Sequence, residues 1–352
     1  MLPSAWLLSC HNTGLTGHSN SVRSLVVSPD GKFVATGCLT DNSIILWDPE
    51  GGAILAKWAT IAGPALDLVF SCGSRGLACL ERPGSIVVWN VENAQVLGVL
   101  ERPSDTVHHW AVAWSPDDQQ LASGSGDGAI RIWDTRTYAQ CQLLQHNNSN
   151  VSVMFVAFSP DGKLLASCRA DTKCCIWEVD TGELKYTLNN HSDIIWASAF
   201  DHNSRRIATV SDALHIWSLE SGDKLLTVRR RSHSTVVFTN DGKHIMLGSS
   251  EGTFMIVDTS NGEIILAIHQ DGGRMDMAQC SPDGKYIVSA SRDGTVCLWN
   301  GSDGTCAATL SPKGTVRDMF GRGHVAFACD GRSLVSGECD GRVYVRKLSD
   351  YV

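Results

Sequence analysis

Residues 281–300 read SPDGKYIVSASRDGTVCLWN, and this stretch decides the fold. It opens with Pro282-Asp283-Gly284, in which proline fixes φ, the Asp side chain bonds its own backbone and glycine tolerates a positive φ. The runs 286–291 and 295–299 are rich in β-branched and aromatic residues, and the Asp293-Gly294 pair between them is a strong hairpin signal. The stretch therefore predicts a tight turn followed by a β-hairpin.

Copies of this pattern recur along the whole chain, about every 40 to 45 residues. Good copies occupy 28–48, 115–134 and 159–178, with weaker ones between them. The final strand of each copy ends at one of eight positions: Trp47, Trp89, Trp133, Trp177, Trp217, Val257, Trp299 and Arg346. Repetition of this length with a Trp-Asp ending resembles the WD-repeat (WD40) family of β-propellers, which have four strands per blade.

The resemblance implies an all-β WD40 propeller, a single domain over residues 1–352 with eight four-stranded blades. Seven blades are the alternative if the second or sixth copy forms none, and Val257 and Arg346 put blades six and eight most in question. The apolar run Trp6 to Cys10 precedes Gly17-His18, where other repeats have their outermost strand. As in the family, we expect the amino-terminal strand to complete the last blade and close the ring.

Composition narrows the functional class. The 352 residues carry a formal net charge of −8, which argues against general affinity for nucleic acid or anionic membranes. The opening MLPSAWLLSC lacks the features of a signal peptide, and no run approaches the length of a membrane span. The cysteines number 13 and most fall in strand patterns, as Cys141, Cys168, Cys175 and Cys297 do. We therefore expect buried reduced thiols and a cytoplasmic or nuclear protein.

Recurring His, Ser/Thr and Asp residues have two readings. A Ser–His–Asp constellation can activate a nucleophile. In WD repeats the same groups form a buried chain, in which Asp holds His, Ser or Thr bridges and the Trp nitrogen donates to the hydroxyl. Because the pattern recurs in copies, we assign it to the scaffold. The positions carried over are His18, Thr36, Asp41, Trp47, Ser123, Asp127, Trp133, Ser167, Asp171, Trp177, His191, Trp217, Ser289, Asp293 and Trp299.

Departures from the family pattern mark individual repeats. Asp105 stands at the His position of the third repeat, and the seventh repeat has no His. The sequence contains no Cys-x2-Cys or His-x3-His pair, and Cys174 and Cys175 on a strand would point to opposite faces. We predict no metal and no cofactor.

A partner-binding rim follows from the resemblance. In the family, side chains three and five places after the His position, and the residue before the turn Asp, point to the channel mouth. Arg230 and Arg231 are added from the loop into the sixth repeat. The predicted rim is Arg23, Arg82, His108, Trp110, Met154, Ile194, Trp196, Arg230, Arg231, Arg274 and Arg292.

These rim positions separate into two arcs. Repeats three to five present an apolar arc of Trp110, Met154, Ile194 and Trp196. Repeats six, seven and one present an arginine arc of Arg230, Arg231, Arg274, Arg292 and Arg23. Exposed large apolar side chains near arginine are typical of interface hot spots. Alternatively the two Trp plug the channel and the arginines face water; binding requires both Trp to be accessible.

The function we expect is a non-catalytic scaffold that binds a protein or peptide through this rim. The apolar arc would bury a hydrophobic anchor, and the arginine arc would hold acidic or phosphorylated side chains. An enzyme or small-ligand site in the central channel is the competing class. It would need three or more of His108, His109, Asp105, Asp276 and Asp318 within hydrogen-bond reach. A third possibility is a sensor or regulatory module of a larger assembly.

Overall fold

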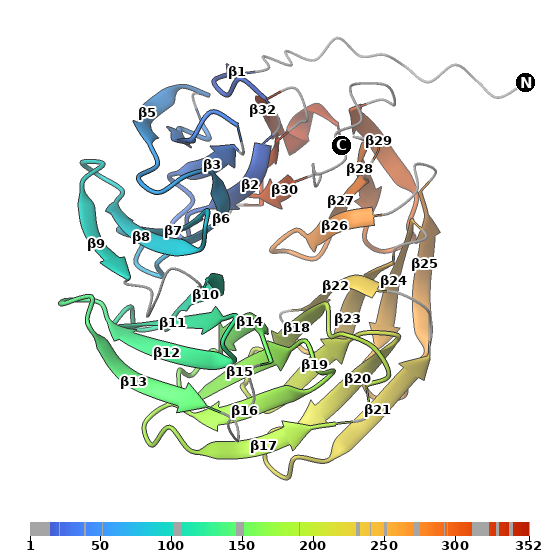
Figure 1. Cartoon of the computed structure of the whole chain (residues 1–352). Coiled ribbons are helices and arrows are strands. Elements are labelled where there is room, and N and C mark those ends of the chain that lie inside the picture. Colours follow the sequence, from blue (N-terminus) through green and yellow to red (C-terminus); the bar gives the residue numbers. More distant parts are fainter. Residues whose placement is uncertain are drawn as a thin grey trace, which may run out of the picture.

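Eight four-stranded antiparallel sheets form a ring in the computed structural model (Figure 1). The structure describes residues 15–20, 22–38, 40–50, 52–100, 108–145, 151–189, 191–229, 233–239, 241–249, 252–270, 275–291, 293, 295–311, 324–328, 331–337 and 341–351. The predicted eight-bladed all-β propeller is confirmed. The seven-blade alternative is wrong, because the second and sixth copies both form complete blades.

The first four blades follow the chain in order, each running from its inner to its outer strand. Blade 1 contains β2 (Val22–Val27), β3 (Val34–Cys38), β4 (Ser43–Trp47) and β5 (Ile54–Ala59). Blade 2 contains β6 (Ala65–Phe70), β7 (Gly76–Glu81), β8 (Ser85–Asn90) and β9 (Val96–Leu100). Blade 3 contains β10 (His109–Trp114), β11 (Gln120–Ser125), β12 (Ala129–Asp134) and β13 (Gln140–Gln145). Blade 4 contains β14 (Val153–Phe158), β15 (Leu164–Arg169), β16 (Cys174–Glu178) and β17 (Leu184–Leu188).

The remaining blades repeat this order until the last, which takes its outer strand from the start of the chain. Blade 5 contains β18 (Ala197–Phe200), β19 (Arg206–Val210), β20 (Ala213–Ser218) and β21 (Lys224–Arg229). Blade 6 contains β22 (His233–Phe238), β23 (His244–Ser249), β24 (Thr253–Asp258) and β25 (Ile264–His269). Blade 7 contains β26 (Met275–Cys280), β27 (Tyr286–Ser291), β28 (Val296–Asn300) and β29 (Cys306–Ser311). Blade 8 contains β30 (His324–Phe327), β31 (Ser333–Gly337), β32 (Arg342–Lys347) and β1 (Leu15–Thr16), and a short 3-10 helix, η1 (Leu348–Asp350), follows it.

The turn that opens the decisive stretch has the conformation its residues predict. Ser281 Oγ donates to Asp283 Oδ1 at 2.7 Å and accepts the Tyr286 backbone N–H at 3.0 Å. Gly284 adopts a φ of 72°, the left-handed region that favours glycine. These bonds reverse the chain between β26 and β27, and Ser28 and Ser159 make the corresponding Ser–Asp bonds in blades 1 and 4.

Pairing between the two ends of the chain closes the ring. Leu15 and Thr16 of β1 pair with Val343 and Arg342 of β32, as closure by the amino-terminal strand predicts (Figure 1). The run Trp6 to Cys10, which we assigned to this strand, lies outside the described residues. The described pairing falls later in the chain, directly before Gly17.

The hydrophobic core consists of eight clusters, one at each seam between neighbouring blades. At the seam between the last and first blades, Val335 and Val343 of blade 8 pack with Val22, Leu25 and Val34 of blade 1. Every blade therefore buries apolar surface against both neighbours, so the ring has no end that must be covered.

Most described cysteines have the burial that the sequence predicts. Cys168, Cys175 and Cys297 are buried inside strands, and all ten described cysteines are free thiols. Cys141 is an exception: it belongs to β13 but is exposed, because β13 is the outermost strand of its blade. A strand pattern alone does not distinguish an inner strand from an outer one.

Candidate functional site

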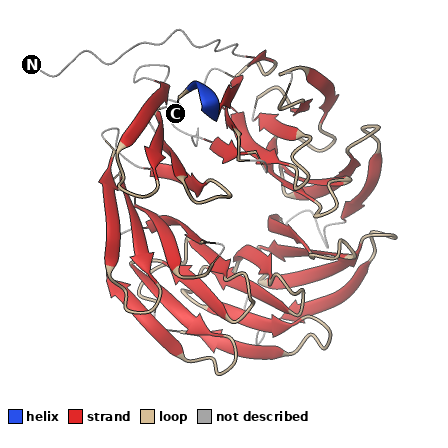
Figure 2. Cartoon of the chain, turned by 180° about the vertical axis from the view of Figure 1, so that it is seen from behind, coloured by secondary structure: helices blue, strands red, loops and turns tan. Residues whose placement is uncertain are grey.

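Strand connectivity gives the ring two rims, one at each end of the strands. Figures 1 and 2 show the ring from opposite sides. The turns between the second and third strands of each blade, and the loops between blades, lie at one end, called here the upper rim. The turns that contain Ser-Pro-Asp, and those between the third and fourth strands, lie at the lower rim. Binding residues collect on loops of a rigid scaffold, so the rims are the first places to examine.

Blade 1 contains the complete hydrogen-bond chain predicted for His18, Thr36, Asp41 and Trp47. His18 Nδ1 lies 3.0 Å from Asp41 Oδ2, and His18 Nε2 lies 2.9 Å from Thr36 Oγ1. Trp47 Nε1 donates to Thr36 Oγ1 at 2.7 Å. Burial lowers the pKa of His18 although its bond to Asp41 raises it. The imidazole is therefore held neutral inside the blade, as a structural group.

The Trp-to-hydroxyl bond recurs in four other blades. In blade 5, His191 Nε2 lies 3.0 Å from Thr209 Oγ1, which accepts the Trp217 indole N–H at 2.8 Å. The corresponding Trp133–Ser123, Trp177–Ser167 and Trp299–Ser289 distances are 2.9, 2.9 and 2.8 Å. The scaffold role predicted for these residues agrees with this placement.

In blades 3 and 4, the Asp residues pair with arginines. Asp127 Oδ2 lies 2.6 Å from Arg131. Burial alone would raise the pKa of Asp127, but hydrogen bonds from Arg131 and Ser125, together with the charge of Arg131, lower this pKa to about 2. Asp171 Oδ2 lies 3.3 Å from Arg169. Asp105, which we placed at the His position of blade 3, lies outside the described residues; within them, His109 packs edge-to-face on Trp133 with ring centroids 6.0 Å apart.

Two residues that the sequence analysis did not assign take the place of missing members of the chain. In blade 7, Gln270 Oε1 accepts a hydrogen bond from Ser289 Oγ, and Gln270 Nε2 donates to the Thr295 carbonyl at 3.2 Å. In blade 8, the buried Arg346 guanidinium donates to Ser336 Oγ, where other blades use an indole N–H. The signal for Arg346 was its place at the strand ending where most other repeats have Trp.

Blade 2 keeps its Trp but replaces the rest of the chain. Cys79 stands where the bridging hydroxyl is expected, and Trp89 Nε1 has no hydrogen-bond partner among the described residues. Glu81 is fully buried at the upper end of β7, and its Oε2 accepts the backbone N–H groups of Ile61 and Ala62 at 2.9 and 2.6 Å. A carboxylate therefore holds the loop into this blade where His and Asp do so in blade 1.

Rim residues five places after the His position share one backbone feature. The pairing of the inner strand with its neighbour skips one residue in blades 1 to 4, 6 and 7. The skipped residues are Arg23, Leu66, Trp110, Met154, Ser234 and Asp276. A β-bulge leaves its extra residue unpaired and re-aims its side chain. At Arg23, Leu66, Trp110 and Met154 the inner strand thus re-aims one side chain at the upper rim.

The apolar arc is exposed at three of its four positions. Trp110, Met154 and Trp196 expose 46%, 44% and 53% of their surface, whereas Ile194 is half-buried. Both Trp residues therefore meet the accessibility condition that separates a binding rim from a channel plug. Trp110 lies on β10, Met154 lies on β14 and Trp196 directly precedes β18, and these three strands follow one another around the centre of the ring (Figure 1).

Trp110 has a defined support. The His108 ring lies edge-to-face with the Trp110 ring at 6.4 Å between centroids. The His108 carbonyl accepts the Gly126 N–H at 2.9 Å, and Ser152 Oγ donates to the Gly126 carbonyl at 3.3 Å. These contacts link blades 3 and 4 beneath the exposed ring and fix its position.

The arginine arc is described only in part. Of its members, Arg23 is described and half-buried; Arg82, a rim position outside this arc, is exposed beside Pro83. Arg230, Arg231, Arg274 and Arg292 lie outside the described residues, as do Asp105 and Asp318 of the alternative channel site. The structure therefore describes the apolar arc on three neighbouring blades and leaves the arginine arc a prediction.

Comparison with known proteins identifies the family. The family model "WD domain, G-beta repeat" matches residues 8–48, 94–134, 139–178, 182–217 and 265–300, more than half of the chain. The chain belongs to the WD-repeat family. The unmatched segments include blades 6 and 8, in which Val257 and Arg346 replace Trp, and most of blade 2, in which Cys79 replaces the hydroxyl.

Individual relatives match shorter segments of this WD-repeat chain. It is 29% identical over 120 residues to the small ribosomal subunit protein RACK1y of Oryza sativa subsp. japonica, covering 33% of the chain and 35% of the relative. It is 36% identical over 83 residues to human cilia- and flagella-associated protein 52, covering 22% of the chain and 13% of the relative. The chain thus spans about a third or less of the length of these relatives.

Among solved structures, the computationally designed Ika8 protein has the same fold. It superposes with a TM-score of 0.78 at 22% identity, over 95% of this chain and 98% of the designed one. In the part of the WD-repeat chain that the structure describes, no helix has the length and apolar character needed to cross a membrane.

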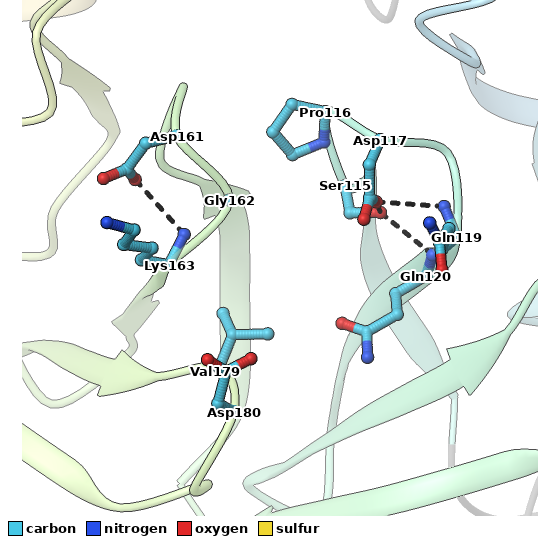
Figure 3. A pocket seen from close by; sticks show the side chains of 10 residues that line it. All are labelled: Ser115, Pro116, Asp117, Gln119, Gln120, Asp161, Gly162, Lys163, Val179 and Asp180. Atoms are coloured by element: carbon cyan, nitrogen blue, oxygen red, sulfur yellow. Dashed lines mark hydrogen bonds between the residues drawn. The ribbon is translucent and has the colours of Figure 1, made fainter.

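The lower rim carries an open polar pocket of about 500 Å³ between blades 3 and 4 (Figure 3). Ser115, Pro116 and Asp117 line one side, and Asp161 and Lys163 face them from the next blade. One oxygen each of Asp117 and Asp161 is taken up by the turn hydrogen bonds of its own blade. The pocket follows from the repeated Ser-Pro-Asp turn, so its lining belongs to the scaffold.

One cluster among the described residues has side chains close enough to surround a metal ion. The ligand atoms of His18, Cys38 and Asp41 lie within 4.8 Å of one another. Both His18 ring nitrogens are already engaged, by Asp41 and by Thr36. The cluster is therefore accounted for by the hydrogen-bond chain of blade 1.

Proposed function

We propose that this chain is a non-catalytic interaction scaffold that binds a protein or peptide through the upper rim of one closed propeller domain, residues 1–352. The observation that carries the proposal is the exposure of Trp110, Met154 and Trp196 on neighbouring blades. Interface hot spots are enriched in Trp and lie in clusters of large side chains. Monomeric proteins seldom leave such a cluster in water without a use.

The geometry also favours binding without rearrangement. Trp110 and Met154 are bulge residues of paired strands, and the Trp196 backbone N–H is bonded to the Val210 carbonyl at 2.9 Å. Anchors held by a rigid sheet lose little conformational entropy when a partner docks. The apolar arc therefore supplies preorganised contact area.

The finer proposal concerns charge. The arginine arc, of which Arg23 is described, would hold acidic or phosphorylated groups of the partner, because guanidinium pairs bidentately with such anions. Reversing Arg274 and Arg292 to Glu would then weaken binding of an acidic partner and flatten its dependence on salt. Unchanged binding would remove this part of the proposal.

We place the protein in the cytoplasm or nucleus, where the ten free thiols of the described residues would stay reduced. Its relatives include a small ribosomal subunit protein and a cilia- and flagella-associated protein. They support a role for this chain as one component of an assembly.

Affinity capture from a native extract tests the proposal. We expect a protein that wild type retains to be lost by the Trp110→Ala, Trp196→Ala double variant. The matched control is Leu143→Ala, Leu225→Ala, which removes exposed side chains of similar accessibility, 50% and 55%, from the outer strands β13 and β21. Equal retention by the rim variant and the control would show that the upper rim is not the binding face.

A further inference from the structure

We propose that the blade 5 end of the apolar arc binds a lysine or arginine side chain, so that the partner segment presents a cation beside its apolar anchors. The inference rests on the proposed function and deepens it, by naming the chemistry of the partner at this part of the rim. It concerns Trp196, Asp193 and Asp212, which lie on the upper loops of one blade.

The first support is the aromatic ring. Trp196 is 53% exposed and its backbone is fixed to Val210 of the neighbouring strand. An accessible indole attracts an ammonium or guanidinium group placed over its face, and Trp is the best of the aromatic side chains for this interaction. A purely apolar partner would make no use of this attraction, whereas a partner with a lysine or arginine side chain would.

The second support is negative charge on the upper loops of the same blade. Asp193 and Asp212 are both exposed. Asp193 Oδ1 accepts the Ile194 N–H at 2.7 Å, and Asp212 Oδ1 accepts the Ser211 hydroxyl at 2.8 Å. A hydrogen bond from Ser192, with one from Ser211, lowers the pKa of Asp212 to about 2, so it is ionised at neutral pH. Both carboxylates are held in place by their own loops.

The neighbouring blades show that these charges are unusual on the arc. In blade 3, Asp127 pairs with Arg131 at 2.6 Å, and in blade 4, Asp171 pairs with Arg169 at 3.3 Å. Among the described residues, no lysine or arginine nitrogen lies within 4 Å of a carboxylate oxygen of Asp193 or Asp212. Among the described residues, Asp193 and Asp212 thus lack the arginine partner that the turn Asp has in blades 3 and 4.

These features commit the surface to one occupant, a peptide segment of a partner protein with an apolar residue and a lysine or arginine close together. Its apolar residue would cover Met154 and Trp110, and its cation would sit at Trp196 between the two carboxylates. The net charge of −8 would also draw a cationic segment toward the chain. An acidic segment in this place would face two like charges and lose affinity.

Selection from a phage-displayed library of random peptides tests the inference. On immobilised wild type we expect enrichment of peptides with lysine or arginine near an aromatic or aliphatic residue. The Asp193→Asn, Asp212→Asn variant should keep the apolar preference and lose the basic one. The Asp180→Asn variant removes an exposed carboxylate from the lower rim and is the control, which should select as wild type does.

One wild-type-selected peptide, made synthetically, gives the quantitative test by calorimetry. Each Asp→Asn change should weaken its binding about two- to fivefold at low salt, the range for an exposed ion pair. Raising the salt concentration should weaken binding to wild type more than binding to the double variant, because salt screens exposed charges. Circular dichroism and tryptophan fluorescence would check that each variant is folded.

The outcomes separate this inference from the proposed function. If the selected peptides are not enriched in lysine or arginine, or are enriched in acidic residues, the inference is overturned. Rim binding then stands, provided that the Trp110→Ala, Trp196→Ala variant no longer selects these peptides. Peptides that the Trp variant selects as well as wild type does would overturn both. No enrichment on wild type would also overturn both.

Discussion

Replacing Thr36 with valine tests the buried hydrogen-bond chain of blade 1. Asp41 is an acceptor, so His18 Nδ1 donates to it and His18 Nε2 accepts from the Thr36 hydroxyl, whose oxygen in turn accepts the Trp47 N–H. Valine has nearly the shape of threonine but neither donates nor accepts. The substitution therefore leaves two buried polar atoms without partners and opens no cavity.

The expected cost follows from these two atoms. Thr36 and Trp47 are fully buried and His18 is 7% exposed, so water cannot replace the lost bonds. An unsatisfied buried polar group costs about 1 to 3 kcal/mol, so we expect Thr36→Val to lower the free energy of unfolding by about 2 to 4 kcal/mol. Thr36→Ser keeps both hydrogen bonds and removes one methyl group, which costs about 1 kcal/mol.

Guanidinium unfolding followed by tryptophan fluorescence and circular dichroism would measure both variants. Coincident transitions from the two probes would establish that a single unfolding free energy is meaningful. The reasoning requires Thr36→Val to be less stable than Thr36→Ser by at least about 1 kcal/mol. Equal stability of the two variants would refute it, because the hydrogen bonds would then contribute nothing beyond the packing of the side chain.

Three further outcomes follow from the same networks. Cys79→Ser supplies the acceptor that Trp89 lacks, so the free energy of unfolding should stay unchanged or rise by about 1 kcal/mol. A fall of that size in guanidinium unfolding would contradict the placement of residue 79 at the bridging position. Arg346→Ala removes the donor to Ser336 and should lower the free energy of unfolding by about 2 to 3 kcal/mol, whereas Arg346→Trp should recover part of this loss. Equal losses in guanidinium unfolding would contradict the assignment of Arg346 to the Trp role. Burial lowers the pKa of His191 from 6.5 to about 4, so between these pH values the unfolded chain binds a proton that the folded chain does not. The free energy of unfolding should therefore fall by roughly 2 kcal/mol as pH drops from 6.5 to 4. His191→Gln should flatten this pH dependence, and an unchanged slope would assign it to other groups.

Sequence reasoning predicted the fold well because the repeat is a local signal. Each copy contains its own turn and hairpin, and a Ser-Pro-Asp turn such as that at Ser281 forms the same bonds wherever it occurs. The number of blades was harder, because Val257 and Arg346 lack the Trp on which the pattern depends. Both blades form because their apolar strands still pack at the seams, where Val257 contributes to the core between blades 5 and 6.

Substitutions inside the blades could not be predicted from the motif. Gln270 takes the role of His in blade 7 from the place before the His position, because an amide can both accept from Ser289 and donate to a carbonyl. Arg346 takes the Trp position of blade 8 because its guanidinium also supplies an N–H to a buried hydroxyl. Motif matching compares residue types, but these positions require only a side chain that can make the same hydrogen bonds.

The candidate site was predictable in position but not in exposure. Counting from the His position identified Trp110, Met154 and Trp196, and the structure adds the bulge that re-aims the first two. Exposure depends on how three blades approach one another around the channel, which no single repeat encodes. Ile194 shows the difference, since the same counting rule selects it and the structure leaves it half-buried.

Site-specific photo-crosslinking tests the central claim most directly. A benzophenone amino acid at Trp110 would report what touches the upper rim in a native extract, and the same group at Leu225 would report on an outer strand of comparable exposure. We predict a discrete crosslinked protein from position 110 that is absent from position 225. Crosslinks only from position 225, or identical products from both positions, would contradict binding through the upper rim.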